Sequence, residues 1–465
     1  MSRWAWRRPA LLALILASAL GTRLWQLGRL SLWYDEVVTM RLARTPGPLA
    51  LLRLLGEIDA TRAPLHPLLL QGWLRLLGTS EAAGRSFSVL CGVLTVFMIA
   101  RLACRMYPDD ATALWAAGLA AVSPLLVVYS REARMYAWLV LVTTFAWDAL
   151  FALRAPNEPN ARRLALYATA LAAMVYSHPL GLLMAGTLGM ASLAFRRDFG
   201  LTWRSWLVVH AAAGLLVAVW LPRFFDHPPE STVGRLPVRF LLGLPIGYLG
   251  GNFLTLAVFL GVIAVGLIRD REDRPERVST SCLLLWLTVP PLILYAYSLV
   301  SHPIFGPERY TLYVGPAYLI LLGRGLASLP RWPSWCVAAL AFGLAAWTLP
   351  GRAYSPDLKA DWRAAAAYLR EADPPAKGVV LVASADPLHN VEVEAARYYL
   401  EPSRPVLPLP EPPAGTIVSA DAPRVWVAVG VRQGKPVRSL PDDWSRSRSV
   451  DLDGLRLFAV QPLSR

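Results

Sequence analysis

Charged residues are scarce in this sequence of 465 residues. Asp, Glu, Lys and Arg make up 17% of it, against 55% hydrophobic residues and a mean hydropathy of +0.42. Because soluble globular domains carry about 25% charged residues, this composition excludes an ordinary soluble protein and indicates several membrane spans. The net charge of +14 comes mostly from arginine, which in membrane proteins marks cytoplasmic loops and lipid headgroups more often than nucleic acid.

Sites for metals, nucleotides and nucleic acids are not indicated. The four cysteines lie in or beside apolar stretches without metal-ligand or CxxC spacing, and the six histidines show no HxxxH pattern. A P-loop and a strand-turn-helix GxGxxG are absent, and no basic stretch carries interleaved aromatic residues. The residues therefore predict no metal site and no nucleic-acid partner, and the energy for any reaction must come from the substrate or from a gradient.

Long apolar segments predict about eleven transmembrane helices, since a bilayer core about 30 Å thick needs roughly 20 apolar residues per helix. They lie near residues 9–25, 86–102, 111–129, 135–153, 164–177, 179–195, 205–222, 253–268, 281–299, 311–327 and 335–350. The predicted fold class is an α-helical polytopic membrane protein.

Arginines in the short loops predict the orientation, because positively charged loops stay in the cytoplasm. They collect before the first span and then in alternate loops, at 101–105, 154–163, 196–197 and 269–277. This pattern places the N-terminus in the cytoplasm. It places the first outer loop, residues 26–85, and the chain after residue 350 outside the cytoplasm.

After residue 350 the chain becomes rich in proline and mixed charge. Short periodic runs predict helices at 361–371 and 391–400 and strands at 378–384, 424–430 and 455–460. We therefore predict a transmembrane domain at 1–350 and a small extracytoplasmic α/β domain at 351–465. In the first outer loop, segments 41–58 and 65–78 have the pattern of helices in the membrane interface, which either cover the span ends or line a substrate site.

Two adjacent acids, Asp35 and Glu36, stand in "SLWYDEVVTM" at residues 31–40, close to the first span. Acids at a membrane surface are costly to desolvate and are therefore candidates for function. The plainer alternative is a pair at a helix N-terminus that faces water. Neighbouring side chains point in different directions, so one acid can do chemistry while the other anchors or positions it.

Arginine and tyrosine occur together in two further segments on the predicted outer side. "SREARMYAW" at 130–138 contains Arg131, Arg134 and Tyr136, and "ERY" at 308–310 contains Arg309 and Tyr310. If a helix begins at residue 131, the first two arginines share one of its faces. Arginines at a span end often only snorkel to headgroups, but a guanidinium also binds phosphate oxygens bidentately.

An acid that accepts a proton and arginines that hold an anion suffice for one reaction, the transfer of a sugar from a lipid-linked phosphate. The phosphate leaving group needs charge stabilisation but no general acid, whereas the acceptor hydroxyl needs a base.

The segments "LWYDEVVT", "APLHPLLLQGWLRLLGTSEAAGRSFSVLCGVLTV" and "SPLLVVYSREARMYAWLVL" closely resemble the bacterial members of glycosyltransferase family 39. This is the protein O-mannosyltransferase-like branch of the GT-C superfamily, related to the aminoarabinose lipid A transferases. The resemblance is specific over about residues 30–150 and continues more weakly through "ERYTLYVGPAYLIL" and "ARYYL". It implies a multi-spanning, inverting hexosyl- or pentosyltransferase of the bacterial inner membrane, which uses a polyprenyl-phosphate sugar donor outside the cytoplasm.

The resemblance also assigns roles to residues. The family's acidic pair falls on Asp35 and Glu36, with the aspartate as the base or acceptor-binding group. The motifs implied for the donor phosphate fall on Arg131, Arg134, Tyr136, Arg309 and Tyr310.

The acceptor side departs from the family pattern. Members read His-Pro-Pro-Leu-Tyr in the first outer loop, whereas "RAPLHP" has Arg62 and Ala63 in place of the histidine and first proline, with His66 four residues later. Arg62, His66 and His178 are therefore the acceptor-site candidates, although a histidine beside a proline, as in "YSHP", is more typical of a turn. The acceptor class, whether protein, lipid or glycan, stays open, as does the use of a divalent metal.

The alternative function is a transporter or flippase for lipid-linked sugars. Transporters tend to have inverted repeats and ionisable residues at mid-membrane. The sequence shows no clear internal repeat and few acids inside the spans.

Overall fold

The structure is a computed structural model. It describes residues 9–59, 61–154, 161–224, 236–301, 304, 308–355, 359–372, 379–383, 391–401, 405–408, 425–432, 435–436, 444–453 and 455–462. The chain forms two compact units, the first made of Met1–Trp25 and Leu42–Ala353 and the second of Gln26–Arg41 and Tyr354–Arg465. The segment Gln26–Arg41, expected in the first outer loop, therefore packs with the C-terminal part of the chain.

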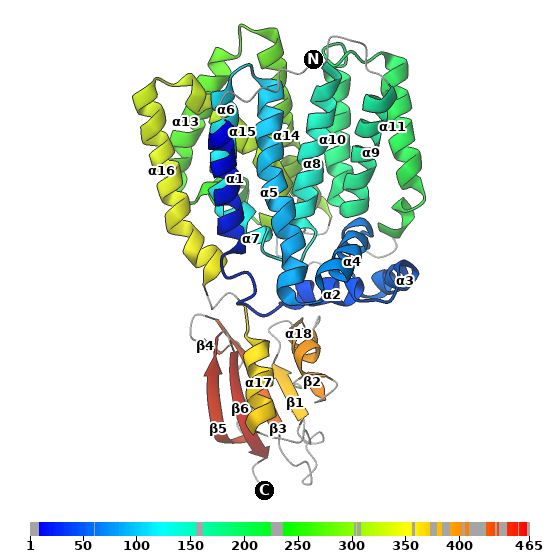
Figure 1. Cartoon of the computed structure of the whole chain (residues 1–465), viewed down its shortest axis with the longest axis vertical. Helices are drawn as coiled ribbons and strands as arrows, with labels where there is room; N and C mark the ends of the chain where they lie inside the picture. The colour runs from blue at the N-terminus through cyan, green and yellow to red at the C-terminus, as the bar shows by residue number, and fades with distance from the viewer. Residues whose placement is uncertain are drawn as a thin grey trace. The chain divides into compact units, whose positions relative to one another are not determined.

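The first unit is helical (Figure 1). Its helices are α1 (Pro9–Leu24), α3 (Pro48–Ile58), α4 (Leu65–Leu77), α5 (Glu81–Met106), α6 (Asp110–Val122), α7 (Pro124–Tyr129), α8 (Tyr136–Phe151), α9 (Ala161–Ser177), α10 (Leu180–Ala194), α11 (Trp203–Ala218), α12 (Arg239–Leu249), α13 (Phe253–Arg269), α14 (Arg274–Val300), α15 (Gly315–Ser328) and α16 (Arg331–Leu349). The short helices η1 (Ala152–Arg154), η2 (Leu221–Phe224), η3 (Glu308–Val314) and η4 (Pro350–Tyr354) extend some of them. Each predicted span coincides with one of these helices or with two in succession.

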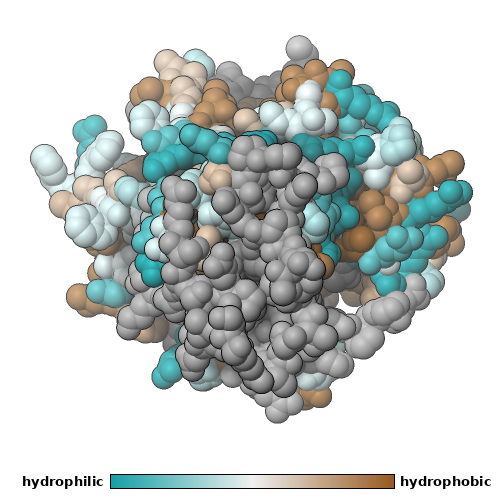
Figure 2. Space-filling view, turned by 90° about the horizontal axis from the view of Figure 1, so that it is seen from below, coloured by the Kyte–Doolittle hydropathy of each residue, from teal (hydrophilic) through white to brown (hydrophobic). Residues whose placement is uncertain are grey.

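Several helices are suited to a membrane. Among the residues described, four are alone long and apolar enough to cross one, at Glu81–Met106, Tyr136–Arg154, Arg274–Val300 and Arg331–Tyr354, and α12 with α13, bent by 82°, is a fifth candidate. Large apolar side chains are exposed on outer helices, such as Leu215 of α11 and Trp347 of α16. Apolar residues also reach the rim of the molecule on several sides (Figure 2). Such exposed apolar surfaces are favourable in contact with lipid rather than with water.

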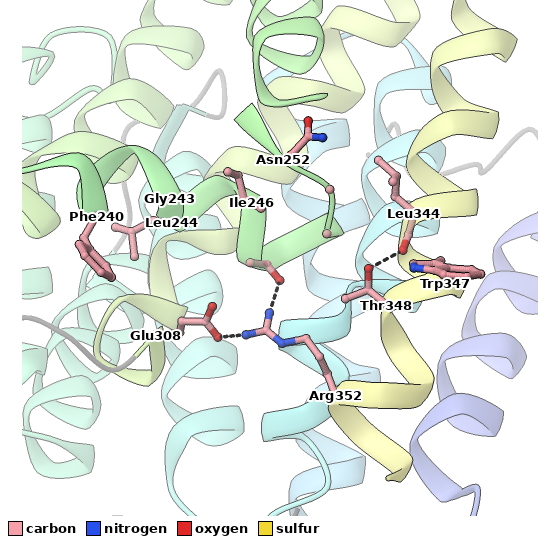
Figure 3. A pocket seen from close by; sticks show the side chains of 13 residues that line it. Phe240, Gly243, Leu244, Ile246, Asn252, Glu308, Leu344, Trp347, Thr348 and Arg352 are labelled. Carbon is pink, nitrogen blue, oxygen red and sulfur yellow. Dashed lines mark hydrogen bonds and ion pairs between the residues drawn. The ribbon is translucent and has the colours of Figure 1, made fainter. Parts of the chain in front are cut away.

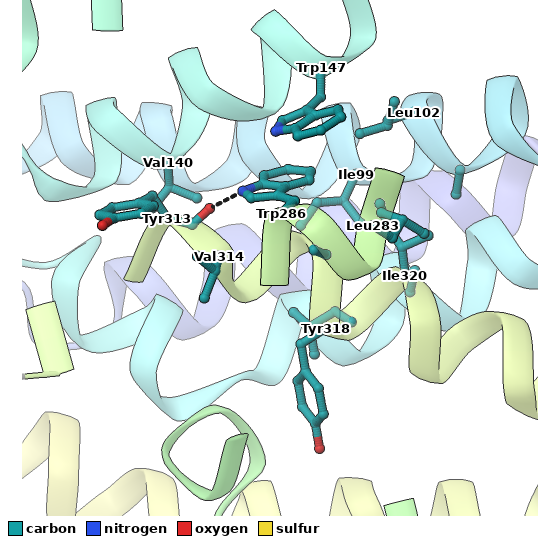
Figure 4. Close-up of a cluster of buried hydrophobic side chains, with 14 of the residues drawn as sticks. Ile99, Leu102, Val140, Trp147, Leu283, Trp286, Tyr313, Val314, Tyr318 and Ile320 are labelled. Carbon is teal, nitrogen blue, oxygen red and sulfur yellow. Dashed lines mark hydrogen bonds between the residues drawn. The ribbon is translucent and has the colours of Figure 1, made fainter. Parts of the chain in front are cut away.

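The core of the helical unit surrounds α15, in which every residue from Gly315 to Leu326 is buried. Beside it Trp147 and Trp286 stack with ring centroids 5.1 Å apart, and the indole N–H of Trp286 donates to the Tyr313 carbonyl at 2.9 Å (Figure 4). A Cβ on Gly325 would lie 2.3 Å from the Val262 carbonyl oxygen. Glycine thus lets the backbones of α13 and α15 touch, as is common between membrane helices.

The two amphipathic segments of the first loop contain helices, as predicted, although the first segment becomes helical as α3 only from Pro48. α3 and α4 lie across one end of the helical unit (Figure 1). Along α4, His66, Leu70 and Leu74 are buried at intervals of four residues, which is the spacing of one helix face, and α4 packs against α5 and α9.

The second unit is a mixed β-sheet with helices α17 (Trp362–Ala372) and α18 (Val391–Leu400). The strands are β1 (Val379–Ala383), β2 (Val406–Pro408), β3 (Val425–Arg432), β4 (Lys435–Pro436), β5 (Trp444–Leu452) and β6 (Leu455–Pro462). Their order is β2-β1-β3-β6-β5, with β4 paired to β3. β1 is parallel to β2 and β3, whereas β6 is antiparallel to β3 and β5. Trp362 and Leu369 of α17 share one core with Val380 and Trp426 of the sheet, so the C-terminal α/β architecture is as predicted.

Candidate active site

The predicted donor residues Arg131 and Arg134 lie in the turn between α7 and α8, not on a helix face. α7 ends at Tyr129 and α8 begins at Tyr136. The backbone N–H of Arg134 donates to the Glu132 carbonyl at 2.8 Å, which is a local turn contact rather than a helical one. The expectation that a helix would align the two arginines was therefore wrong, and each has its own partners.

Arg131 is tied to the C-terminal end of α1. It is 8% exposed, and its Nη1 donates to the carbonyl of Arg23 at 2.9 Å and to that of Trp25. The fully buried side chain of Arg23 in turn donates to the Ala121 carbonyl at 2.9 Å. This packing needs Gly92 of α5, where a Cβ would lie 2.7 Å from Arg23 Nε.

Arg134 faces the end of α3. Its Nη1 lies 3.8 Å from the carboxylate of Asp59, and both side chains are almost fully buried. Asp59 also accepts from the backbone N–H and the hydroxyl of Thr61 at 2.8 and 2.7 Å, so its carboxylate is held in place. The guanidinium of Arg134 lies 6.0 Å from the centre of the Tyr136 ring.

A row of rings joins Tyr136 to the second predicted motif. The centroids of Tyr136 and His178 are 6.3 Å apart, and those of His178 and Tyr310 are 6.4 Å apart. The guanidinium of Arg309 stands 5.3 Å from the centre of the Tyr310 ring. Residues far apart in the sequence, on α8, the α9–α10 turn and η3, therefore meet at the end of the unit that carries α3 and α4. We call this end the α4 end.

Two histidines of the α4 end are buried in their neutral form. Burial, and then the charge of Arg134, lowers the pKa of His66 and that of His178 to about 3. The backbone N–H of Leu180 donates to Nδ1 of His178 at 3.0 Å, so the proton of the neutral ring is on Nε2. His178 thus completes a turn, and it also lies beside two tyrosines.

Of the acceptor-site candidates in the first loop, His66 is the one near Arg134. It packs against Phe87 with centroids 5.7 Å apart, and its Nε2 is buried without a hydrogen-bond partner among the described residues. Arg62 has a positive φ of 49° and directs its Nη1 to the Arg223 carbonyl at 3.3 Å.

A pocket of about 760 Å³ opens next to Glu308, the residue before Arg309. Arg352 donates to the Glu308 carboxylate at 2.5 Å and to the Gly247 carbonyl at 3.3 Å (Figure 3). Phe240 and Trp347 lie on opposite sides of it. The pocket therefore combines a charged floor with apolar walls.

Glycines shape this pocket at the turn between α12 and α13. Gly250 and Gly251 have φ of +82° and +96°, a conformation that disfavours side chains. A Cβ on Gly250 would lie 2.2 Å from the Thr348 hydroxyl, and one on Gly247 would lie 3.0 Å from the Glu308 carboxylate.

The predicted acidic pair belongs to the second unit. Asp35 and Glu36 lie in the first turn of α2 (Tyr34–Ala43), which agrees with the helix N-terminus alternative in position, but Glu36 does not face water as that alternative expects. Asp35 is partly exposed, whereas Glu36 is completely buried. The Glu36 carboxylate accepts from Lys359 Nζ at 2.7 Å and from the Trp33 backbone N–H at 3.4 Å.

Within the described part of the chain, no three His, Cys, Asp or Glu residues gather as a metal site. Several contacts at these sites were not predicted, namely those of Asp59, Arg352 and Lys359. Their partners are distant in the sequence, so local motifs gave no sign of the pairing. The sequence does single out Lys359 in one respect: only three of the 46 basic residues are lysines, so a lysine is unusual in this chain.

Comparison with known proteins finds a family match for part of the chain and a shared fold over 96% of it. Residues 61–222 match the family described as dolichyl-phosphate-mannose-protein mannosyltransferase. No curated protein sequence matches the chain. ArnT from Cupriavidus metallidurans in the apo state has a similar structure, with a TM-score of 0.61 and 16% identity over 96% of this chain and 97% of that chain.

Two further structures agree. The same ArnT bound to undecaprenyl phosphate has a TM-score of 0.59, with 16% identity over 96% of this chain and 97% of that chain. The apo oligosaccharyltransferase of Archaeoglobus fulgidus has a TM-score of 0.55 and 12% identity over 88% of this chain and 65% of that chain. The predicted resemblance to the mannosyltransferase-like family is thus confirmed over residues 61–222. The predicted fold class, an α-helical membrane-type fold followed by a small C-terminal α/β domain, is confirmed as well.

Proposed function

We propose that this protein is an inverting membrane glycosyltransferase that moves a sugar from a polyprenyl-phosphate donor to an acceptor outside the cytoplasm. One observation carries the proposal. The segment that matches the mannosyltransferase family contains Arg131 and Arg134, and the α4 end joins Arg134 through a row of rings to Arg309. The family match does not favour the transporter alternative.

Each group has a role in a single displacement. The acceptor hydroxyl attacks the anomeric carbon of the donor, the bond from that carbon to the phosphate oxygen breaks, and the electron pair leaves with the phosphate. Arg131, Arg134 and Arg309 stabilise the charge that develops on the phosphate. Asp35 takes the hydroxyl proton as the base, and attack from the face opposite the phosphate inverts the anomeric centre.

The pocket beside Glu308 suits the donor. Its walls of Phe240, Leu344 and Trp347 offer apolar surface to a polyprenyl chain, while Arg352, paired with Glu308, forms its charged floor. The crystal structure of ArnT with undecaprenyl phosphate, which has the same fold, supports a lipid phosphate as the donor's carrier.

The test is donor turnover by the purified protein. Wild type and Asp35→Asn would each be incubated with a panel of radiolabelled polyprenyl-phosphate sugars and a membrane extract, and loss of the labelled lipid would be followed. We expect wild type to consume one donor and Asp35→Asn to be slower by about 10²- to 10⁴-fold, the usual contribution of a general base. The matched control is Glu57→Gln, which removes an exposed acid on α3 and should keep full activity.

The product's anomeric configuration, measured by NMR, tests the stereochemistry. A product of retained configuration would contradict the single displacement. An Asp35→Asn protein that is folded and fully active would remove Asp35 as the base.

A further inference from the structure

The second unit holds the acidic pair from several sides. Residues 31–36 are contacted by Lys359, by the start of α17 and by α18, although more than 300 residues separate these elements from residues 31–36 in the sequence. The backbone N–H of Leu32 donates to the Tyr399 hydroxyl at 2.7 Å, and the Ser31 hydroxyl donates to the Asp361 carboxylate at 2.9 Å. Asp361 also accepts from the Ala364 N–H at 3.0 Å, so this anchor is the cap of α17.

The strongest of these contacts is the pair of Lys359 and Glu36. Its N–O distance is 2.7 Å, the Glu36 side chain is 0% exposed and the Lys359 side chain is 12% exposed. A buried carboxylate is stable only when it is paired and hydrogen-bonded. Glu36 meets this requirement with Lys359 and with the Trp33 N–H. In the second contact, the third residue of α2 accepts from the backbone N–H of the residue just before the helix, as in a capping box.

Asp35 differs from its neighbour in exposure. It is partly exposed, and its carbonyl accepts from the Thr39 hydroxyl at 3.0 Å inside the first turn of α2. Once Glu36 is fixed, the backbone of that turn is fixed, and the direction of the Asp35 side chain follows from it. The buried acid therefore orients the partly exposed one.

We infer that Lys359 is a positioning residue, which acts through Glu36 to hold Asp35 in its reactive geometry, so that the C-terminal unit is part of the catalytic machinery. The inference rests on the proposed function, in which Asp35 is the base. It resolves the choice that the adjacent acids leave open: Asp35 does the chemistry and Glu36 anchors it. A lysine suits the task because its compact ammonium satisfies one carboxylate oxygen, whereas a guanidinium needs five acceptors.

The first test is kinetic, with the full-length protein and the donor that wild type consumes. We expect Lys359→Met to lower kcat by about 10- to 100-fold, because small misplacements of a reacting group have effects of that size, and to leave the donor KM within about twofold. Lys359→Arg, which keeps the charge but brings a guanidinium with more donors than the site satisfies, should recover only part of the loss. The matched control is Arg41→Gln, which breaks the exposed pair of Arg41 and Glu394 between the same two segments and should leave kcat unchanged.

A double variant tests whether the effect passes through Glu36. If it does, adding Lys359→Met to Glu36→Gln should slow the reaction no further. Independent, multiplicative losses, or a wild-type kcat in Lys359→Met, would overturn the inference.

The second test does not need activity. Hydrogen exchange of the peptide covering residues 31–41 should be faster in Lys359→Met than in wild type and in Arg41→Gln. Unchanged exchange would show that Lys359 does not anchor α2 and would overturn the inference even if wild type proved inactive. A wild type that consumes no donor, with this exchange effect present, would instead count against the proposed function alone.

Discussion

The two ends of the helical unit hold their arginines in different ways. At the α4 end, the buried guanidinium groups of Arg23 and Arg131 donate to backbone carbonyls, and Arg134 lies 3.8 Å from one carboxylate, that of Asp59. At the opposite end, which we call the far end, buried Arg324 lies within 2.8 Å of three carboxylates, those of Asp109, Asp270 and Glu276. Asp148 there is shared by Arg101 and Arg105.

Under the proposed function, the far-end arginines stabilise the fold, whereas those of the α4 end bind the donor. Carboxylates neutralise a guanidinium and lock the helices that carry them, here α6, α13, α14 and α15. Backbone carbonyls orient a guanidinium through hydrogen bonds, and under the proposed function an oriented guanidinium in a dry site stabilises the departing phosphate. Under the proposed function, we therefore expect substitutions at the far end to lower mainly the stability, and substitutions at the α4 end to weaken mainly donor binding.

The largest expected effect is on stability at the far end. Arg324→Met would leave three carboxylates around a buried site without their shared cation. Since breaking a buried ion pair costs about 3–5 kcal/mol, we expect a clear fall in the thermal unfolding midpoint in detergent, with the donor KM unchanged in the protein that remains folded. Arg324→Lys, which keeps the positive charge, should lower the unfolding midpoint less. Equal midpoints for wild type and both variants would show that Arg324 does not stabilise the far end.

The next largest effect is on donor binding at the α4 end. Arg131→Gln removes a charged donor to the phosphate, and hydrogen bonds to charged groups contribute about 1.5–3 kcal/mol, so the donor KM should rise by about 10- to 100-fold. Arg101→Gln is the matched arginine at the far end and should leave the donor KM as it is. Equal donor KM values for both variants and wild type would remove the distinction between the two ends.

The helices could be predicted from the sequence because long apolar runs determine them, and the helices at 362–372 and 391–400 followed from their local pattern. Strand β5 was missed because it lies at the edge of the sheet and reads "WSRSRSVDL", in which arginine and serine replace the apolar alternation of a half-buried strand.

Sequence motifs supplied the residues proposed for the site, but their geometry could not be predicted from those motifs. The segment around Arg131 favours a helix locally, yet the carbonyls of Arg23 and Trp25 hold it in a turn. The partners of Arg134 and Glu36 are Asp59 and Lys359, and such pairs depend on the tertiary fold rather than on spacing along the chain. The sequence left open which acid of the pair is the anchor, and burial of Glu36 favours that residue.

Acidification should affect the α4 end through its neutral histidines. The pKa of His66 is about 3 in the folded protein and about 6.5 when unfolded. Between these values the unfolded state binds a proton that the folded state does not, so stability falls as the pH falls from 6.5 towards 3. At pH 5 the loss is about 2 kcal/mol for this group.

Hydrogen exchange at pH 7 and pH 5, corrected for intrinsic rates, would measure this effect. Peptides of α4 should lose protection at pH 5, and His66→Gln should reduce that loss. A pH response that His66→Gln leaves unchanged would show that another group is responsible.

The smallest effect on stability is expected at Asp148 of the far end, where two arginines pair with the same carboxylate. Arg101 lies 3.2 Å from the Asp148 carboxylate and is 32% exposed, while Arg105 lies 2.6 Å from the same carboxylate and is 21% exposed. Arg101→Gln should therefore cost less than about 1 kcal/mol, as is usual for partly exposed pairs, because Arg105 still neutralises Asp148. The double change Arg101→Gln with Arg105→Gln should cost more than the sum of the two single changes, since it alone leaves Asp148 buried and unpaired. Additive losses in urea or thermal unfolding would mean that Asp148 has another source of charge, and that the far end is held by more than its ion pairs.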